Sequence, residues 1–391
     1  MTKITNELNQ IKEAGGGRLY ETAGEPGILV PVMTGSYFEM GKQYGEMLGE
    51  LMQKTYDTLV QPLFDKKLLE YDDAVASFGR KAWSTTSSRL REAYRGAVEG
   101  SGMSRERLLL LDQQIYMQIY QAKLHSFSGC SSIFAWGDST TDGRMVLARN
   151  LDWGASFMNN QQVFAVWNPT GPDHSYANFA PAGWVGATMT GINDQGLYFD
   201  LHDGTSMGGA VIYMGRSPLL NSLTDALAEV DDVGALGTRL CSIRADISNI
   251  CQMADTREAR CYENPVHDTL LLPNDETILA TANTFMNPAF GIMPRDTESK
   301  SLERRANLHA RLEEAKSRID ADKILEIMDL GLYNPDGSPG RGATKPLIEK
   351  QYDVDVTVHT IAARPADLQI WLKVPTQTEW CHIDLKSLFS G

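Results

Sequence analysis

The chain has 391 residues, of which 42% are hydrophobic and 22% charged, and its 36 basic and 50 acidic residues give a formal net charge of −14. This acidic balance argues against nucleic acid and anionic membranes as partners, because both bind basic surfaces. The polar first residues lack the apolar core of a signal peptide, and no run approaches the roughly 20 apolar residues of a membrane span, so we expect a cytoplasmic protein.

Helices are predicted for most of the chain up to residue 125. Apolar residues recur at helical spacing over 38–59, an Asp-Asp pair suited to a helix N-terminus opens 72–98, and Ser104 precedes another helix start. Three glycines lie four apart on one face of the first helix, at Gly41, Gly45 and Gly49. This stripe predicts close packing against another backbone.

After residue 130 the pattern changes to short strands bounded by turn residues, which is typical of an antiparallel sheet. The predicted strands are 132–136, 144–150, 162–167, 176–179, 185–192, 196–201, 258–262, 268–272, 277–281, 354–362 and 368–374. The predicted helices in this half are 216–230, 234–255, 301–316 and 321–331. Sheets with segregated helices indicate an α+β layered fold, and the absence of a linker or repeat indicates one compact unit. The turn-rich loop 331–343 is predicted to be a surface connection, with a lid over a pocket as the minority alternative.

The five cysteines stand at positions 130, 241, 251, 261 and 381. This odd number shows neither the close pairs of a zinc site nor a dense disulfide framework, so reduced thiols and no metal are expected.

The most informative cysteine is Cys130, which follows Gly129 and precedes a predicted hairpin over 132–150. Antiparallel pairing brings the far end of this hairpin back beside the cysteine. If the Gly129-Cys130 bond were cut, Cys130 would carry both a thiol and its own α-amine. The reference pKa of such an amine is about 7.7 to 8.0, so it could accept the thiol proton near neutral pH.

Two charged residues lie at the returning end of the hairpin. Arg149 could stabilise the thiolate, because a nearby cation lowers the pKa of a cysteine, and Asp152 could orient the α-amine. Residues 149 and 152 point to opposite faces of an ideal strand, so a bend or bulge is expected after Asn150. The alternative is a packing cysteine at a strand start with a surface Arg/Asp pair.

Gly129-Cys130 together with Arg149-Asn150-Leu151-Asp152-Trp153 resembles the autoproteolytic N-terminal-nucleophile hydrolases of the isopenicillin N acyltransferase type, relatives of the choloylglycine hydrolases and penicillin V acylases. The glycine-punctuated segments 35–45 and 95–102 and the turn 191–197 are also similar to segments of that family. The likeness therefore extends over most of the chain.

The resemblance implies an αββα sandwich of two antiparallel sheets between helical layers. Residues 1–129 would be a helical pro-segment or α-chain wrapped around a core of residues 130–391. The implied activity is that of an amidohydrolase or acyltransferase, which acts on a small N-acyl amide through a Cys130 thioester after cleavage at Gly129-Cys130. No cofactor is implied, the expected partner is the small-molecule amide, and self-association is left open.

Further site residues follow from the resemblance. Asn283 stands where the family carries an asparagine that helps to bind the oxyanion, and Arg304 stands where an arginine supports the nucleophile, with Arg305 as the competing choice. A second oxyanion donor could be His202 or the backbone N–H of Ser131. Aromatic residues near the motifs could line an apolar acyl pocket, namely Trp136, Trp153, Trp184 and Phe285.

Two other functions are kept open by the sequence. The chain could be an uncleaved homologue that binds or senses a small amide, which would need no reactive thiol. It could also be a cysteine hydrolase in which a histidine, His125 or His202, serves as the base.

Overall fold

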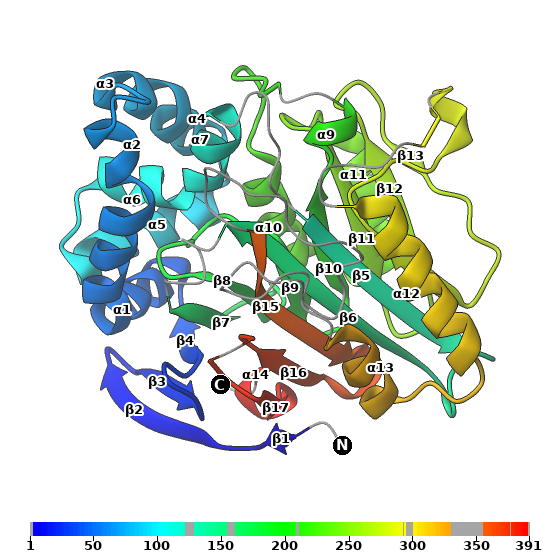
Figure 1. Ribbon diagram of the computed structural model, residues 1–391. Helices are drawn as coiled ribbons and strands as arrows, with labels where there is room; N and C mark the ends of the chain where they lie inside the picture. Colours follow the sequence, from blue (N-terminus) through cyan, green and yellow to red (C-terminus); the bar gives the residue numbers. More distant parts are fainter. Residues whose placement is uncertain are drawn as a thin grey trace.

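The computed structural model of the protein shows a mixed α+β fold with two β-sheets and helices packed on them (Figure 1). It describes residues 3–121, 129–154, 161–208, 211–291, 293–294, 300–329, 355–375 and 377–389. The loop predicted at 331–343 and the candidate base His125 lie outside the described residues. Within the described part, no helix is long and apolar enough to cross a bilayer.

The chain begins with four strands, which the predicted helical segment 1–129 did not include. They are β1 (Ile4–Thr5), β2 (Leu8–Ala14), β3 (Gly17–Thr22) and β4 (Leu29–Gly35). β4 pairs in parallel with β7 (Gln162–Pro169), and β1 pairs in parallel with β17 (Trp380–Asp384). The part of the chain before Cys130 therefore contributes strands to both sheets.

The helical part follows β4, as the apolar spacing predicts. Its elements are α1 (Tyr37–Leu59), α2 (Gln61–Asp65), α3 (Tyr71–Ala74), a π-helical turn (Val75–Gly79), α4 (Arg80–Thr85), α5 (Ser88–Ser101), α6 (Arg105–Asp112) and α7 (Gln114–Gln121). Ser36 and Glu39 form a capping box that fixes the start of α1. The single helix predicted over 72–98 is divided, because Thr86 has an extended backbone and Ser87 caps the N-terminus of α5.

Glycines hold α1 and α5 in direct backbone contact, which confirms the predicted close packing. A Cβ on Gly41 would lie 2.0 Å from the carbonyl oxygen of Ala93, and one on Gly96 would lie 1.9 Å from that of Phe38. Both distances are far below any real Cβ contact. Only glycine at these positions therefore lets the two helices approach this closely.

The seven-stranded sheet has the order β1-β17-β16-β15-β6-β5-β14. Its remaining strands are β5 (Gly129–Gly137), β6 (Gly143–Gly154), β14 (Ile278–Thr281), β15 (Asp355–Arg364) and β16 (Gln369–Lys373). All of its pairs are antiparallel except β1 with β17. The hairpin predicted around Cys130 is thus β5–β6, at the centre of the described fold.

The ten-stranded sheet has the order β13-β12-β11-β10-β9-β8-β7-β4-β3-β2. Its further strands are β8 (Tyr176–Pro181), β9 (Thr190–Asn193), β10 (Tyr198–Asp203), β11 (Asn249–Ala254), β12 (Ala259–Asn264) and β13 (Leu270–Leu271). The helix predicted over 234–255 was wrong in its second half, because α11 (Val233–Ser242) ends there and β11 follows. All six residues of β11 are buried, including the polar Asn249 and Gln252, so the strand lacks the alternation that marks a half-exposed strand.

Helices cover the outer sides of the sheets. α12 (Ser301–Ala315) and α13 (Ala321–Met328) bury Leu308, Leu312 and Ile324 against apolar residues of β5 and β6. α10 (Leu219–Glu229) lies on the other sheet, where Asn193 Nδ2 donates to the carbonyl oxygens of Leu227 and Val230. The remaining helical elements are α9 (Thr205–Gly208), α11 (Val233–Ser242), α14 (Lys386–Phe389) and 3₁₀ turns at Pro288–Phe290 and Pro365–Asp367.

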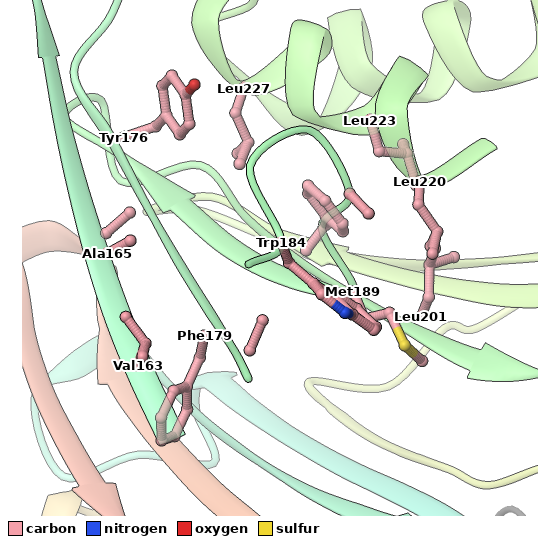
Figure 2. Packing of buried hydrophobic residues seen from close by; sticks show 14 of the residues in the cluster. Val163, Ala165, Tyr176, Phe179, Trp184, Met189, Leu201, Leu220, Leu223 and Leu227 are labelled. Atoms are coloured by element: carbon pink, nitrogen blue, oxygen red, sulfur yellow. The ribbon is translucent and has the colours of Figure 1, made fainter. Parts of the chain in front are cut away.

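Figure 2 shows buried apolar side chains of the ten-stranded sheet, on β7, β8 and β10, and of α10, together with Trp184 and Met189 from the segment between β8 and β9. Polar contacts join the two sheets: Ser132 on β5 bonds to Asp200 on β10. Cys130 lies on the β5 strand that makes these contacts.

Candidate active site

Cys130 is the second residue of β5, and its side chain is fully buried. In the register between β5 and β6, Cys130 pairs with Leu151 and Gly129 pairs with Asp152. The structure therefore confirms that the hairpin returns residues 149–152 to the cysteine.

The Arg149 guanidinium lies between the two sheets beside the thiol. Its Nη2 is 3.5 Å from Cys130 Sγ and donates to the carbonyl oxygen of Leu201 at 2.8 Å. Its Nη1 donates to the carbonyl oxygen of Met189 at 3.1 Å and to the Thr190 hydroxyl. These acceptors lie on β9, on β10 and just before β9, so the ten-stranded sheet fixes the cation against the sulfur.

The environment of the thiol opposes its ionisation. Burial raises the pKa of the Cys130 thiol above its ordinary value, the Arg149 cation lowers it, and the Asp152 charge raises it again. The thiol is therefore protonated near neutral pH in this arrangement, and nucleophilic attack requires a base within reach.

Asp152 lies on β6, like Arg149, but its side chain points to the opposite face of the sheet. Thr357 donates from its hydroxyl to Asp152 Oδ1 at 2.7 Å, and Arg304 Nη1 lies 3.9 Å from Oδ2. Burial raises the pKa of the Asp152 carboxyl to about 6, against the opposing effects of the Arg304 cation and the Thr357 hydroxyl. The carboxyl therefore titrates nearer to neutral pH than an ordinary aspartate.

The bend or bulge expected after Asn150 is not seen in the pairing of β5 with β6, where the register is regular. The pairing of β15 with β6 does shift its register, between Thr357 and His359, opposite Asp152 and Leu151. No bulge is needed between β5 and β6, because Arg149 and Asp152 approach Cys130 from opposite faces of the sheet, one from the intersheet side and one from the side of α12.

Asn283, two residues after the end of β14, holds the backbone of the cysteine. Its Oδ1 accepts a hydrogen bond from the backbone N–H of Cys130 at 2.7 Å, and its Nδ2 donates to the carbonyl oxygen of Asp203 at 3.0 Å. An amide nitrogen carries two hydrogens, so one remains beyond the contact with Asp203. The oxyanion role implied for Asn283 would fall to this second hydrogen.

Arg304, in the first turn of α12, is the arginine that faces the cysteine. Its Nη1 donates to the carbonyl oxygen of Cys130 at 2.6 Å and to Ser131 Oγ at 2.5 Å, and its Nη2 donates to Asn283 Oδ1 at 3.0 Å. The side chain is 4% exposed. These contacts resolve the choice between Arg304 and Arg305 in favour of Arg304.

Two further candidates lie near this group. His202 on β10 is buried, with Nε2 2.8 Å from Ser132 Oγ and Nδ1 3.2 Å from the carbonyl oxygen of Ala282. Burial lowers the pKa of the His202 imidazole. Trp153 is the last residue but one of β6, and its Nε1 donates to Gln118 Oε1 on α7 at 3.0 Å. The oxyanion roles considered for His202 and Ser131 stay predictions.

The structure adds Ser132 and Asp200, which the sequence analysis did not select. The Ser132 hydroxyl lies 2.9 Å from each carboxylate oxygen of Asp200, and both residues are fully buried. A signal was present in the sequence, because Asp200 interrupts an apolar strand and a buried carboxylate needs hydrogen-bonding partners. Its partner could not be identified, because Ser132 lies on the other sheet.

A pocket lies beside the site. Its lining is mostly apolar and consists of Ile115, Tyr116, Ile119, Trp153, Met189, Leu201, His202, Asp203, Leu219, Leu220, Ile247, Ser248 and Asn249. Three of these residues also contact the site, because the carbonyl oxygens of Met189, Leu201 and Asp203 hold Arg149 and Asn283. An apolar group bound here would therefore lie next to the side chains that surround Cys130.

Metal-ligating side chains gather elsewhere, on the surface. Potential ligand atoms of Glu276, His309 and Glu313 all lie within 4.8 Å of one another. Glu313 also pairs with Lys316 at 3.3 Å, and the two glutamates are exposed. This group contacts none of the side chains around Cys130 that are described above.

Comparison with solved structures finds similar folds at low sequence identity. A mutant conjugated bile acid hydrolase from Clostridium perfringens is 14% identical, with a TM-score of 0.47 over 67% of this chain and 94% of that one. A Caenorhabditis elegans N-acylethanolamine-hydrolyzing acid amidase ortholog is 14% identical, with a TM-score of 0.42 over 67% and 98%. Penicillin V acylase from Agrobacterium tumefaciens is 11% identical, with a TM-score of 0.42 over 66% and 87%. No protein-family model and no curated protein matches the chain.

Proposed function

We propose that the protein is a cysteine N-terminal-nucleophile amidohydrolase or acyltransferase that acts on a small N-acyl amide and is activated by cleavage of its own Gly129-Cys130 bond. The observation that carries this proposal is the separate anchoring of the three polar parts of Cys130. Asn283 holds its nitrogen, Arg304 its carbonyl oxygen and Arg149 its sulfur, at 2.7, 2.6 and 3.5 Å. A packing cysteine would also need partners for its buried backbone N–H and carbonyl oxygen, but it would not need a cation at its sulfur.

The cleavage step uses the thiol of the intact chain. Cys130 Sγ attacks the carbonyl carbon of Gly129, the C–N bond between the two residues breaks, and the thiol proton ends on the nitrogen that becomes the α-amine. Water then hydrolyses the resulting thioester, which leaves a carboxyl group on Gly129 and restores the thiol. Asn283 Oδ1, which accepts the Cys130 N–H, is placed to hold the new amine.

The mature site would use the amine as its base. Burial raises the pKa of the thiol, so an acceptor next to it is needed, and the α-amine of the same residue is the nearest group that could serve. The thiol attacks the acyl carbon while its proton passes to the amine and then to the leaving nitrogen. Asn283 Nδ2 would donate its second hydrogen to the oxyanion.

The acyl thioester is then resolved by water, which gives hydrolysis, or by a second amine, which gives acyl transfer. Both routes restore the thiol. The apolar pocket beside the site favours an apolar acyl group.

In the proposed αββα fold, residues 1–129 would stay bound after cleavage. β1 and β4 pair with strands of the two sheets, and α7 supplies Ile115, Tyr116 and Ile119 to the wall of the pocket. The mature enzyme would therefore be a complex of two chains, both of which form the substrate site.

Trapping of the acyl-enzyme tests this function. The protein is mixed with N-acyl amides of increasing acyl length, quenched in acid and digested, and the peptide that begins with Cys130 is weighed. We expect an added acyl mass that hydroxylamine removes, as a thioester requires. Cys251→Ala, which alters another buried cysteine, should keep the adduct, and Cys130→Ala should lose it. Turnover of the same amides by Cys130→Ala would disprove the proposal.

A further inference from the structure

We infer that Ser132, Asp200 and His202 form an intersheet lock, which positions Arg149 and Asn283 against Cys130. The inference rests on the proposed function and adds positioning residues to it. The name intersheet lock is used for these three side chains only. They make no contact with the sulfur in the structure, so their effect would pass through the strand that carries two of them.

The lock ties β10 to β5. The Ser132 hydroxyl lies 2.9 Å from both oxygens of the Asp200 carboxylate and 2.8 Å from His202 Nε2. His202 Nε2 is also 3.2 Å from Asp200 Oδ1. All three side chains are at most 1% exposed, so water does not compete for these bonds.

The lock also ties β10 to the end of β14. His202 Nδ1 lies 3.2 Å from the carbonyl oxygen of Ala282, the residue that precedes Asn283. In the tautomer that carries the proton on Nδ1, this nitrogen donates to that carbonyl oxygen. Asp200 and His202 thus hold one short stretch of β10 against β5, which carries the nucleophile, and against the segment after β14, which carries its amide partner.

That stretch of β10 holds the two groups that contact Cys130. The carbonyl oxygen of Leu201, between the two lock residues, accepts from Arg149 Nη2 at 2.8 Å. The carbonyl oxygen of Asp203, the next residue after His202, accepts from Asn283 Nδ2 at 3.0 Å. A shift of β10 along β5 would therefore displace Arg149 from the sulfur and Asn283 from the nitrogen together.

Ser132→Ala is the direct test, because it removes the hydroxyl that joins the sheets and changes the side-chain volume very little. Tyr198→Phe is the matched control. The Tyr198 hydroxyl donates to Asp200 Oδ2 at 3.1 Å, but both residues lie on β10, so this bond does not join the sheets. Asp200→Asn is a second substitution in the intersheet lock, and it replaces Ser132→Ala if that variant fails to fold.

Three quantities are measured on each variant. The first is the rate of self-cleavage, and the second is kcat together with KM for an amide that the wild type hydrolyses. The third is the rate at which iodoacetamide modifies Cys130, followed by peptide mass. Misplacement of a reacting group by about 1 Å can cost about 100-fold in rate. We expect Ser132→Ala to lower kcat and the rate of self-cleavage at least tenfold with KM within about twofold, and to slow alkylation, whereas Tyr198→Phe should match the wild type.

Equal rates for Ser132→Ala and Tyr198→Phe in all three assays would overturn the inference. A rise in KM with kcat unchanged would also overturn it, since this would indicate a role in substrate binding. Alkylation needs no turnover, so it separates the two proposals. If the wild type cleaves neither itself nor any amide, the proposed function fails, while slower alkylation of Ser132→Ala would still support the lock.

Discussion

Asn283→Ala tests the amide that holds the nitrogen of Cys130. In the structure this change removes three hydrogen bonds, to Cys130 N, Arg304 Nη2 and the carbonyl oxygen of Asp203, and all three groups are buried. A buried polar group left without its partner costs about 1–3 kcal/mol. Loss of an oxyanion donor adds about 2.7–4 kcal/mol to the activation barrier, which is about 10²–10³ in kcat.

The control for this variant is Asn287→Ala, four residues along the chain. Asn287 is also buried, and its side-chain amide makes two hydrogen bonds. Nδ2 donates to the carbonyl oxygen of Leu271 at 2.9 Å, and Oδ1 accepts from the backbone N–H of Ala289 at 3.0 Å. Both variants should lose stability, measured as the free energy of unfolding in urea. Only Asn283→Ala should lose kcat by at least 100-fold in steady-state assays. A kcat within about threefold of the Asn287→Ala value would refute the role given to Asn283.

Three further predictions follow from other parts of the structure. Arg304→Met should slow self-cleavage at least tenfold, because it removes the hydrogen bond to the carbonyl oxygen of Cys130. Arg305→Met should leave the rate unchanged, and mass spectrometry of freshly expressed chains measures the cut fraction of each variant. The pKa of Asp152 is about 6 in the folded chain and 3.8 for an ordinary aspartate, so the folded chain binds more protons than the unfolded chain between these pH values. The free energy of unfolding should therefore fall by about 3 kcal/mol as the pH rises through this range. That loss should disappear in Asp152→Asn when both forms are unfolded in urea in a Cys130→Ala background, and an unchanged pH slope would contradict it. Gly96→Ala should cost at least about 1–3 kcal/mol in the same assay, because its Cβ would lie 1.9 Å from the carbonyl oxygen of Phe38, whereas Gly79→Ala has ordinary space and should be tolerated.

Much of the candidate site could be predicted from local sequence. Gly129, Cys130, Arg149 and Asp152 belong to one hairpin, so turn residues and strand patterns were enough to bring them together. Asn283 and Arg304 came only from the family resemblance, because their approach to Cys130 depends on pairing of distant strands and on the packing of α12. The side of the strand from which Asp152 acts also depends on α12, which the hairpin alone does not place.

Sequence reasoning failed where burial or long-range contacts decide the structure. The buried strand β11 was predicted as part of a helix, since a strand buried on both faces shows no alternation of apolar and polar residues. The strands before α1 were overlooked, although β4 joins β2 and β3 to the ten-stranded sheet through its parallel pairing with β7. Ser132 and Asp200 lie 68 positions apart and meet only because the two sheets face each other.

The central claim is that Cys130 becomes the N-terminal residue of a new chain by its own chemistry. The most direct measurement is the intact mass of the purified protein under denaturing conditions, with N-terminal sequencing of each species, for the wild type and Cys130→Ala. We expect two wild-type chains, the larger beginning Cys-Ser-Ser-Ile, and a single uncut Cys130→Ala chain. A wild-type chain that stays intact, or a Cys130→Ala chain cut at the same bond, would contradict it.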